Sequence, residues 1–333
     1  MASIKKIAEA SSVSVATVSR VLNNPEKVLP KTRQKVLHII EKFEYVPNPL
    51  AKALATGGTN LIAMIIPTLN NSFFAKQAEG CQVYLLGKGY NLVIICSDKY
   101  SEHEIGILKS IDQRQFKGMI IAGSGIYESE YPKIIKQVNI PLVIIEDLPN
   151  NYSVSSVFNN DMMGVKAAID HLVKTGHARI AAVTGESNFI ATKRRLRYLQ
   201  SYLQEKFPGY ELPVVTAEYS SPSTGRNALE TLMNTDPRPT AVLAFNDMIA
   251  LGLIKASYEI GIRIPEELSV IGFDDIPMAS FSKPSLSTVY SPSEDLGKEA
   301  AKLLLDQIDN QDTSVKNILI PVKLILREST INT

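Results

Sequence analysis

Residue types that usually build metal or cross-linked sites are scarce in this chain. Its 333 residues include no tryptophan, two cysteines and four histidines. The cysteines, Cys81 and Cys96, fall in an apparent helix and an apparent strand, so we expect core thiols and no disulfide framework. The histidines lack metal-ligand spacing with cysteine or carboxylate residues, so no metal site is predicted.

The chain also lacks long apolar runs. The longest, such as 61–67 and 118–122, are far shorter than the roughly 20 residues that span a bilayer. The N-terminal segment is amphipathic and shows no secretory signal. We therefore expect a cytoplasmic protein without a membrane partner.

Motifs that mark common α/β enzymes are missing as well. Gly123 and Gly125 match the first two glycines of a dinucleotide fingerprint, but Glu128 stands where the third glycine is needed. No G-x-x-x-x-G-K-[ST] phosphate loop and no G-x-S-x-G nucleophile elbow occurs. A nicotinamide-dependent enzyme is therefore disfavoured, and no catalytic residue or cofactor is predicted.

The first sixty residues contain three short apolar patterns with helical spacing, which together could bury one small core. The link between the first two patterns, residues 10–13, is only long enough for the tight turn of a helix-turn-helix unit. The apolar positions are Ile4, Ile7 and Ala8 in the first pattern, Val18, Val21 and Leu22 in the second, and Val36, Ile40 and Phe43 in the third.

The second pattern is typical of a DNA-recognition helix. Ser14 is placed to cap its N-terminus, and its first turn points Val15, Ala16, Ser19 and Arg20 outward. Arginine there can bond guanine bidentately, worth about 1–3 kcal/mol of discrimination, while the small apolar residues can contact thymine methyl groups. A small helical bundle that binds protein is the alternative, but such a bundle does not need an outward arginine in this register.

Positive charge is concentrated in the same region. Residues 1–60 carry nine basic and four acidic side chains, a net charge of +5, whereas the whole chain carries +1. The segment that would meet DNA phosphates is therefore the basic part of the protein.

After residue 59 strand and helix signals alternate. Two sets of four apolar runs are each followed by polar, helix-compatible segments, which predicts two doubly wound lobes with parallel sheets. Ligands bind beyond the carboxyl ends of such strands, and the polar residues that end these runs favour a small, hydroxyl-rich ligand between the lobes. The runs are 61–67, 91–97, 118–124 and 141–146, then 179–185, 213–219, 240–246 and 269–274.

Short motifs along essentially the whole chain match one protein family. They are IKKIA at 4–8, VSVATVSRVLN at 13–23, YVPN at 45–48, AKAL at 51–54, NDM at 246–248 and IGFDDIP at 271–277. In these motifs the chain resembles the lactose/galactose-repressor (LacI/GalR) family of bacterial transcription regulators. The resemblance implies an α/β protein with an N-terminal all-α helix-turn-helix headpiece and a periplasmic-binding-protein-like type I core.

The resemblance also implies a division of the chain into parts. Residues 1–46 would form the headpiece, 47–60 a hinge helix and linker, and 61–333 the effector-binding and dimerisation core. The first lobe of that core would comprise about 61–160 and 291–320, and the second about 161–290 and 321–333.

For DNA, the resemblance implies a homodimer on a pseudo-palindromic operator, with one headpiece per half-site. Leu54 would be inserted into the minor groove by the hinge helix and bend the duplex, and Lys52 would add charge there. A short core helix is the alternative for this segment. The implied DNA-contacting residues are Ser14, Val15, Ala16, Thr17, Ser19, Arg20, Asn23, Lys52 and Leu54.

For the effector, the resemblance implies a cleft for a sugar or sugar phosphate, with aromatic walls and with arginine and aspartate for the ligand's hydroxyl groups. The phenylalanines could instead be lobe core, Asn246 a helix cap, and Arg195 part of a solvated basic run. No contact is expected from Asn160-Asp161, since the family more often has these residues in the reverse order. The implied effector-binding residues are Phe73, Phe74, Asp147, Arg195, Tyr219, Asn246 and Asp274.

Together these features predict a repressor of a carbohydrate-utilisation operon whose operator affinity depends on a sugar-like effector. Two alternatives within the family are a catabolite-control-type regulator driven by a phosphorylated carrier protein and a purine-responsive repressor. A sugar-binding protein of a transport system would require a signal peptide and no headpiece.

Overall fold

Two separate units make up the structure, a computed structural model, with the division between Thr59 and Asn60. No helix among the described residues combines the length and apolar composition needed to cross a membrane. The structure describes residues 3–45, 59–98, 101–111, 115–123, 130–148, 152–187, 189–216, 222–309 and 314–331.

The first unit is a headpiece of three α-helices and one short 3₁₀ turn. Ser3 and Ser14 cap the first two helices, and the turn between them contains Ser12 in the left-handed region at φ 53°, where glycine is usual. The predicted stripes meet in one core, except that Phe43 follows the third helix and stays 41% exposed. The elements are α1 (Ile4–Ala10), α2 (Val15–Asn23), η1 (Pro25–Lys27) and α3 (Pro30–Lys42).

The second unit begins with a six-stranded sheet whose order is β11-β5-β4-β3-β1-β2 and whose neighbours are all parallel. Its central strands are continuous apolar runs because helices cover both faces. The strands are β1 (Leu61–Ile66), β2 (Asn91–Cys96), β3 (Gly118–Ala122), β4 (Leu142–Ile145), β5 (Ser155–Asn159) and β11 (Asn317–Ile320).

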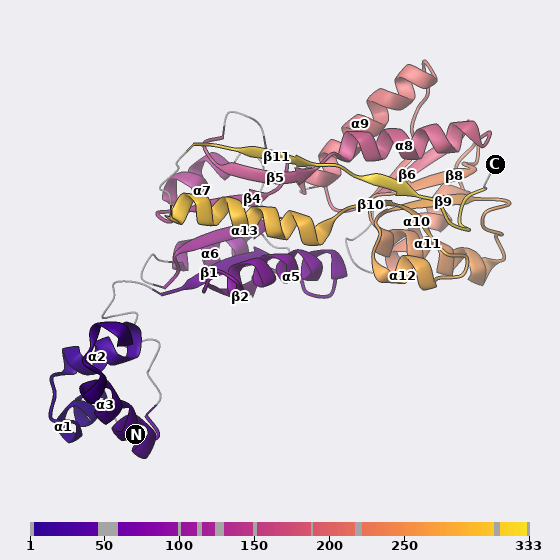
Figure 1. The fold of residues 1–333 in the computed structure, drawn as a ribbon. Coiled ribbons are helices and arrows are strands. Elements are labelled where there is room, and N and C mark those ends of the chain that lie inside the picture. The colour runs from indigo at the N-terminus through magenta and orange to yellow at the C-terminus, as the bar shows by residue number, and fades with distance from the viewer. Residues whose placement is uncertain are drawn as a thin grey trace. The chain divides into compact units, whose positions relative to one another are not determined.

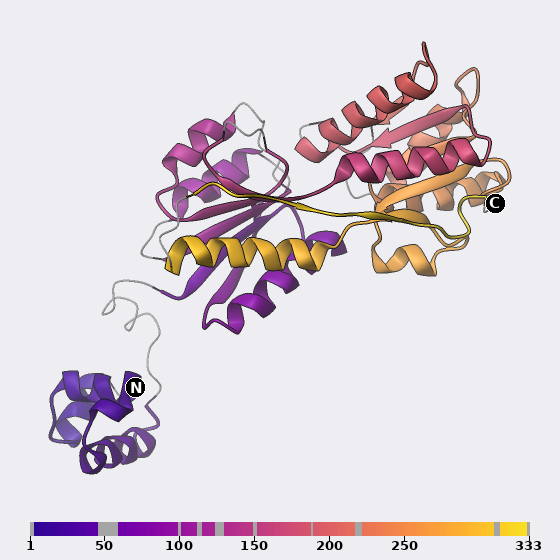
Figure 2. The same cartoon turned by 45° about the horizontal axis from the view of Figure 1, so that its top comes forward.

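Alternate residues of β1 pack against different helices of this first lobe. Ile62 and Met64 join the core under α5 and α13, whereas Ala63 and Ile65 join the core under α6 and α7. Figures 1 and 2 show α13, although late in the sequence, lying along this sheet beside α5. The helices are α5 (Ser72–Leu86), α6 (Ser101–Ser110), α7 (Tyr131–Gln137) and α13 (Ser293–Asp309).

The second lobe is built on a sheet with the order β12-β10-β9-β8-β6-β7, in which β12 alone runs antiparallel to its neighbour. Helices α8 and α9 cover one face, and α10, α11 and α12 cover the other. The elements are α8 (Asp161–Lys174), β6 (Ile180–Thr184), α9 (Ile190–Lys206), β7 (Val214–Thr216), α10 (Pro222–Met233), β8 (Ala241–Ala244), α11 (Asp247–Ile260), β9 (Ser269–Asp274), α12 (Pro277–Phe281), β10 (Ser287–Tyr290) and β12 (Lys323–Ile325).

The chain passes between the lobes at three places. It crosses after β5 into α8, after β10 into α13, and between β11 and β12. The last crossing is the yellow segment that joins the two lobes in Figures 1 and 2. Both sheets therefore contain a strand from the C-terminal part of the chain, and the pocket described below lies between lobes joined by three segments.

All eight predicted apolar runs contain a strand, but four strands have no clear sequence signal: β5, β10, β11 and β12.

The expectation for the cysteines is half wrong. Cys81 is buried and its Sγ donates to the Gly297 carbonyl at 3.0 Å, whereas Cys96 is exposed at the end of β2. Cys96 is exposed because β2 is an edge strand, none of whose residues is fully buried.

Candidate functional site

The exposed side of α2 is the first candidate site. Val18 and Val21 face the headpiece core, so Val15, Ala16 and Arg20 are left exposed at the surface. Ser19 is half-buried. Three of the four residues that the helical pattern turns outward are therefore exposed, and Ser19 is partly covered.

Ser14 and Thr17 are already committed to the start of this helix. The Ser14 Oγ accepts from the Thr17 backbone N–H at 3.1 Å, and the two hydroxyl oxygens lie 2.9 Å apart. This cap fixes the angle at which the first turn leaves the preceding loop. The side chain of Asn23, and all of Lys52, Leu54 and Tyr219, lie outside the described residues.

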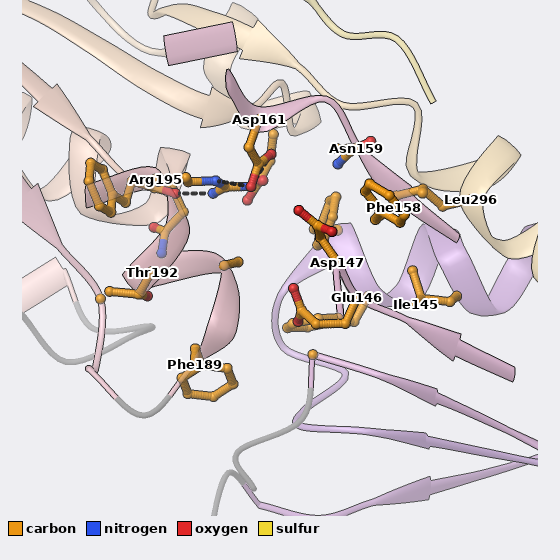
Figure 3. Close-up of a pocket in the computed structure, with 18 of the residues that line it drawn as sticks. Ile145, Glu146, Asp147, Phe158, Asn159, Asp161, Phe189, Thr192, Arg195 and Leu296 are labelled. Atoms are coloured by element: carbon orange, nitrogen blue, oxygen red, sulfur yellow. Dashed lines mark hydrogen bonds and ion pairs between the residues drawn. The ribbon is translucent and has the colours of Figure 1, made fainter. Parts of the chain in front are cut away.

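The second candidate site is a pocket between the two lobes, at the carboxyl ends of their strands (Figure 3). The ends of β4 and β5 and the first turns of α5 line it from the first lobe, and α9 with the ends of β8 and β9 lines it from the second. Six of the predicted effector residues are brought together here: Phe73, Phe74, Asp147, Arg195, Asn246 and Asp274.

Phe73 and Phe74 form an aromatic wall of the pocket and also belong to the core. Their rings meet edge to face with centroids 5.5 Å apart, and Phe74 is 2% exposed within the core of the first lobe. Gly123 makes room for this wall, because a Cβ at that residue would lie 2.4 Å from the Phe74 ring. The phenylalanines therefore line the pocket, and Phe74 is at the same time part of the first-lobe core, while contact with an effector stays a prediction.

Arg195 is buried, so the interpretation of its basic run as a solvated face is wrong at this position. Its Nε donates to Asp161 Oδ2 at 3.0 Å, its Nη1 donates to the Phe245 carbonyl, and its guanidinium stacks 3.6 Å from the Phe273 ring centroid. Figure 3 shows the interaction of Arg195 with Asp161 at the edge of the pocket. These contacts hold the guanidinium in one plane beside the cavity.

Asp161 thus lines the pocket, although no ligand contact is expected from Asn160-Asp161 on the family pattern. Its neighbour Asn160 is the N-cap of α8 and accepts from the Met163 N–H at 3.1 Å. With asparagine used for the cap, the carboxylate of the next residue is left to pair with Arg195.

A second ion pair connects the lobes directly. Arg194 on α9 donates through Nη1 to Oδ2 of Asp147, which follows β4, at 2.6 Å. The two side chains are 20% and 24% exposed. Nearby, Ile190 of α9 is buried in the core of the first lobe, so this helix contacts both lobes at its N-terminal end.

Two carboxyl groups in the pocket are buried and have raised pKa values. Burial, with the added charge of Asp161, raises the pKa of Glu146 to about 8, although Arg195 and Arg194 act in the opposite direction. Burial also raises the pKa of Asp274 well above its usual range, with Arg195 again opposing the shift. A carboxyl group in such surroundings is neutral more readily than one in water.

Asp274 is held in an unusual backbone conformation, with φ 114°, and Asp275 follows at φ 56°. Two contacts fix this turn: Asp247 Oδ2 accepts from the Ile276 N–H at 2.7 Å, and Arg327 pairs with Asp275 at 2.7 Å. Burial raises the pKa of Asp247 to about 7.

Three polar atoms on residues that line the pocket are buried without a hydrogen-bond partner: Gln77 Oε1, Asn159 Oδ1 and Asn246 Nδ2. Asn246 is also the N-cap of α11, since its Oδ1 accepts from the Ile249 N–H at 2.9 Å. Its two predicted roles are therefore compatible. Buried unsatisfied polar atoms are rare in native proteins, and here three of them belong to residues that line one pocket.

Comparison with known proteins gives two family matches. Residues 3–48 match the family described as "Bacterial regulatory proteins, lacI family", and residues 169–330 match "Periplasmic binding protein-like domain". These segments contain the recognition helix and most of the second lobe.

Similar proteins match over nearly the whole chain. Catabolite control protein A of Priestia megaterium is 30% identical over 329 residues, covering 98% of each chain. The ribose operon repressor of Halalkalibacterium halodurans is 31% identical over 330 residues, covering 99% of this chain and 97% of its own. The crystal structure of the Lac repressor dimer bound to operator and the anti-inducer ONPF matches with a TM-score of 0.89, 25% identity and 99% coverage of each chain.

Proposed function

Because the chain belongs to the LacI family of bacterial regulatory proteins, we propose that a small polyhydroxylated ligand in the pocket between its lobes controls its affinity for operator DNA. The protein is a DNA-binding transcriptional repressor and not an enzyme. The observation that carries the proposal is the set of buried, unpartnered polar atoms in a pocket that also holds Arg195 and Asp274.

The headpiece is the DNA-binding part in this proposal. Arg20 reads a guanine, Val15 and Ala16 contact thymine methyl groups, and Ser14, Thr17, Ser19 and Asn23 lie against the adjacent bases and phosphates. Lys52 and Leu54 act from the hinge segment 47–60, which joins the headpiece 1–46 to the core 61–333. The protein works in the cytoplasm, where its operator is.

The pocket suits a sugar. Phe73 and Phe74 offer an apolar wall, while Arg195, Asn246 and Asp274 offer donors and acceptors to hydroxyl groups from the second lobe. Asp147 and Tyr219 complete the proposed contacts. Similarity to a ribose operon repressor supports a carbohydrate ligand.

Ligand binding changes the operator affinity by changing the angle between the two lobes. Helix α9 already contacts the first lobe through Ile190 and Arg194, so a ligand that bonds both lobes changes how firmly they close. Coupling between two sites in a protein is usually about 1–3 kcal/mol, enough to change operator occupancy.

A homodimer presents two headpieces to a pseudo-palindromic operator. Large exposed apolar side chains lie on α5, β2, α11 and α12, which share one side of the two lobes in both views (Figures 1 and 2). An apolar surface of this kind is typical of a protein interface. Its residues are Val83, Leu86, Ile94, Tyr258, Ile260, Met278 and Phe281.

Calorimetric titration with glucose, galactose and ribose tests the ligand site. We expect one of these sugars to bind the wild type, with at least tenfold weaker binding to Arg195→Ala. The matched control is Arg197→Ala, which removes an exposed arginine two residues along α9 and leaves binding unchanged. Equal binding by all three proteins would contradict the assignment of the pocket. A regulator driven by a phosphorylated carrier protein would bind none of these sugars.

A further inference from the structure

The pocket contains more carboxyl groups than it has cations to pair with them. Of its four acidic residues, Asp147 and Asp161 each form an ion pair with an arginine of α9. The other two, Glu146 and Asp274, form no ion pair among the described residues. Arg194 and Arg195 are thus already paired, whereas Glu146 and Asp274 have no counter-ion among the described residues.

Glu146 is the acidic group on the first-lobe side. It is nine-tenths buried, and burial raises its pKa to about 8. The charged groups that face it are Asp161 and Asp147, which disfavour its ionised form, and Arg195 and Arg194, which favour it. Burying a carboxylate without a counter-ion is costly, so Glu146 holds its proton at neutral pH when the pocket is empty.

Two further acceptors lie on the same side of the pocket. Gln77 is 2% exposed, and its Oε1 has no hydrogen-bond partner. Asn159 Oδ1 is also buried without a partner. In Figure 3, Glu146 and Asn159 lie on the opposite side of the pocket from Arg195. The first-lobe side therefore holds two buried acceptors without partners near the unpaired Glu146, whereas the unpartnered atom on the second-lobe side is the donor Asn246 Nδ2.

We propose that this first-lobe side binds a protonated amine, so that the effector is an amino sugar or a similar polyhydroxylated amine. An ammonium group would supply the counter-ion that Glu146 lacks, and its donors can bond the carboxylate oxygens of that side chain. A phosphate or carboxylate there would leave Glu146 without a counter-ion. The inference rests on the proposed function, because it names the ligand class of the same pocket.

Binding of an amine changes the protonation of Glu146. The ammonium group favours the carboxylate, so the Glu146 proton passes to solvent when the complex forms below about pH 8. Titration at pH 6.5 in two buffers of different ionisation enthalpy measures this released proton as a difference in apparent binding heat.

The test compares amino sugars with their parent sugars on the full-length protein. Glucosamine, galactosamine and mannosamine are each titrated beside glucose, galactose and mannose, with glucose 6-phosphate and N-acetylglucosamine as the anionic and neutral probes. We expect at least one amine to bind tenfold or more tightly than its parent, with proton release. Glu146→Gln should reduce that preference to less than threefold, and the control Glu102→Gln, an exposed glutamate on α6, should keep it.

Two results would overturn the inference. One is that no amine binds more tightly than its parent sugar, and the other is that the preference persists in Glu146→Gln. If a parent sugar still binds and depends on Arg195, the proposed function stands while the amine site fails. Absence of binding by every sugar and amine would count against both.

Discussion

Arg194 and Asp147 join the two lobes by an ion pair, with Nη1 and Oδ2 only 2.6 Å apart. Asp147 belongs to the first lobe and Arg194 to α9 of the second, so the pair resists opening of the pocket. Because both side chains are about four-fifths covered, water screens the pair less than it screens a surface ion pair.

A double-mutant cycle with Arg194→Gln and Asp147→Asn measures this link. We expect a coupling of about 1 kcal/mol in the free energy of unfolding, near the upper end of values for exposed pairs. The control cycle uses Arg263 and Glu267, an exposed pair on one segment, for which a smaller coupling is expected because water screens it. Strictly additive effects of Arg194→Gln and Asp147→Asn would show that the pair does not connect the lobes energetically.

Glu146 should make the protein less stable as the pH rises. The folded protein keeps this proton up to about pH 8, whereas an unfolded glutamate releases it near 4.5, so the folded state binds more protons between these values. The free energy of unfolding therefore falls with rising pH across this window, by an amount on the order of a few kcal/mol.

Urea unfolding of wild type and Glu146→Gln at pH 5, 7 and 9 checks this dependence. The variant should lose less stability than wild type between pH 5 and 9. Asp247 titrates in the same window but is present in both proteins, so its contribution cancels in the comparison. Parallel curves for the two proteins would contradict the buried, unpaired state of Glu146.

Asp247 should matter for the ligand although it does not line the pocket. It accepts from the Thr288 hydroxyl at 2.5 Å and from the Ile276 N–H at 2.7 Å, just after the turn that carries Asp274. In Asp247→Asn the buried Thr288 hydroxyl must turn to accept from the new amide group and loses its own acceptor, which costs about 1–3 kcal/mol.

We expect Asp247→Asn to lower both the stability and the affinity for the ligand. Thr288→Val is the matched variant, because it removes one of the two bonds and leaves the contact with Ile276 in place. It should reduce stability less and change ligand affinity less than twofold. Urea unfolding and calorimetry separate the two effects, and equal ligand affinity in Asp247→Asn and wild type would show that Asp247 does not position the turn.

Phe281→Asp should weaken the dimer. Phe281 is 84% exposed on α12, and a charge there would be buried in the proposed interface without a partner. Sedimentation equilibrium should show a dissociation constant at least tenfold higher than that of wild type. The control is Leu319→Asp on β11, an exposed apolar residue on the opposite sheet edge from β2, which should leave the dimer intact.

The sequence was most informative where a pattern extends over many residues. Apolar runs such as 61–66 and 269–274 must be strands because both of their faces are buried, and the polar residues that end them converge by geometry alone. Strand β5 was missed because only two of its five residues are large and apolar. Asn159, at its end, was therefore missed with it.

Other site residues depend on contacts that no single segment encodes. Asp161 lines the pocket because Asn160 takes the capping role and Arg195 arrives from another helix. Gln77 is a single polar residue on a largely apolar stretch of α5. It lines the pocket only because the strand ends pack beside that helix. The link between Arg194 and Asp147 likewise depends on how the lobes close, which local patterns do not determine.

Fluorescence anisotropy on a labelled palindromic duplex with a central CG step tests the central claim most directly. Wild type, Arg195→Ala and Arg197→Ala are each titrated with and without the sugars and amino sugars named above. The account predicts that one of these compounds changes the operator affinity of wild type and Arg197→Ala by about 5–150-fold. Arg195→Ala should respond less than twofold. A full response in Arg195→Ala, or no response in wild type, would contradict control of operator binding by a ligand in this pocket.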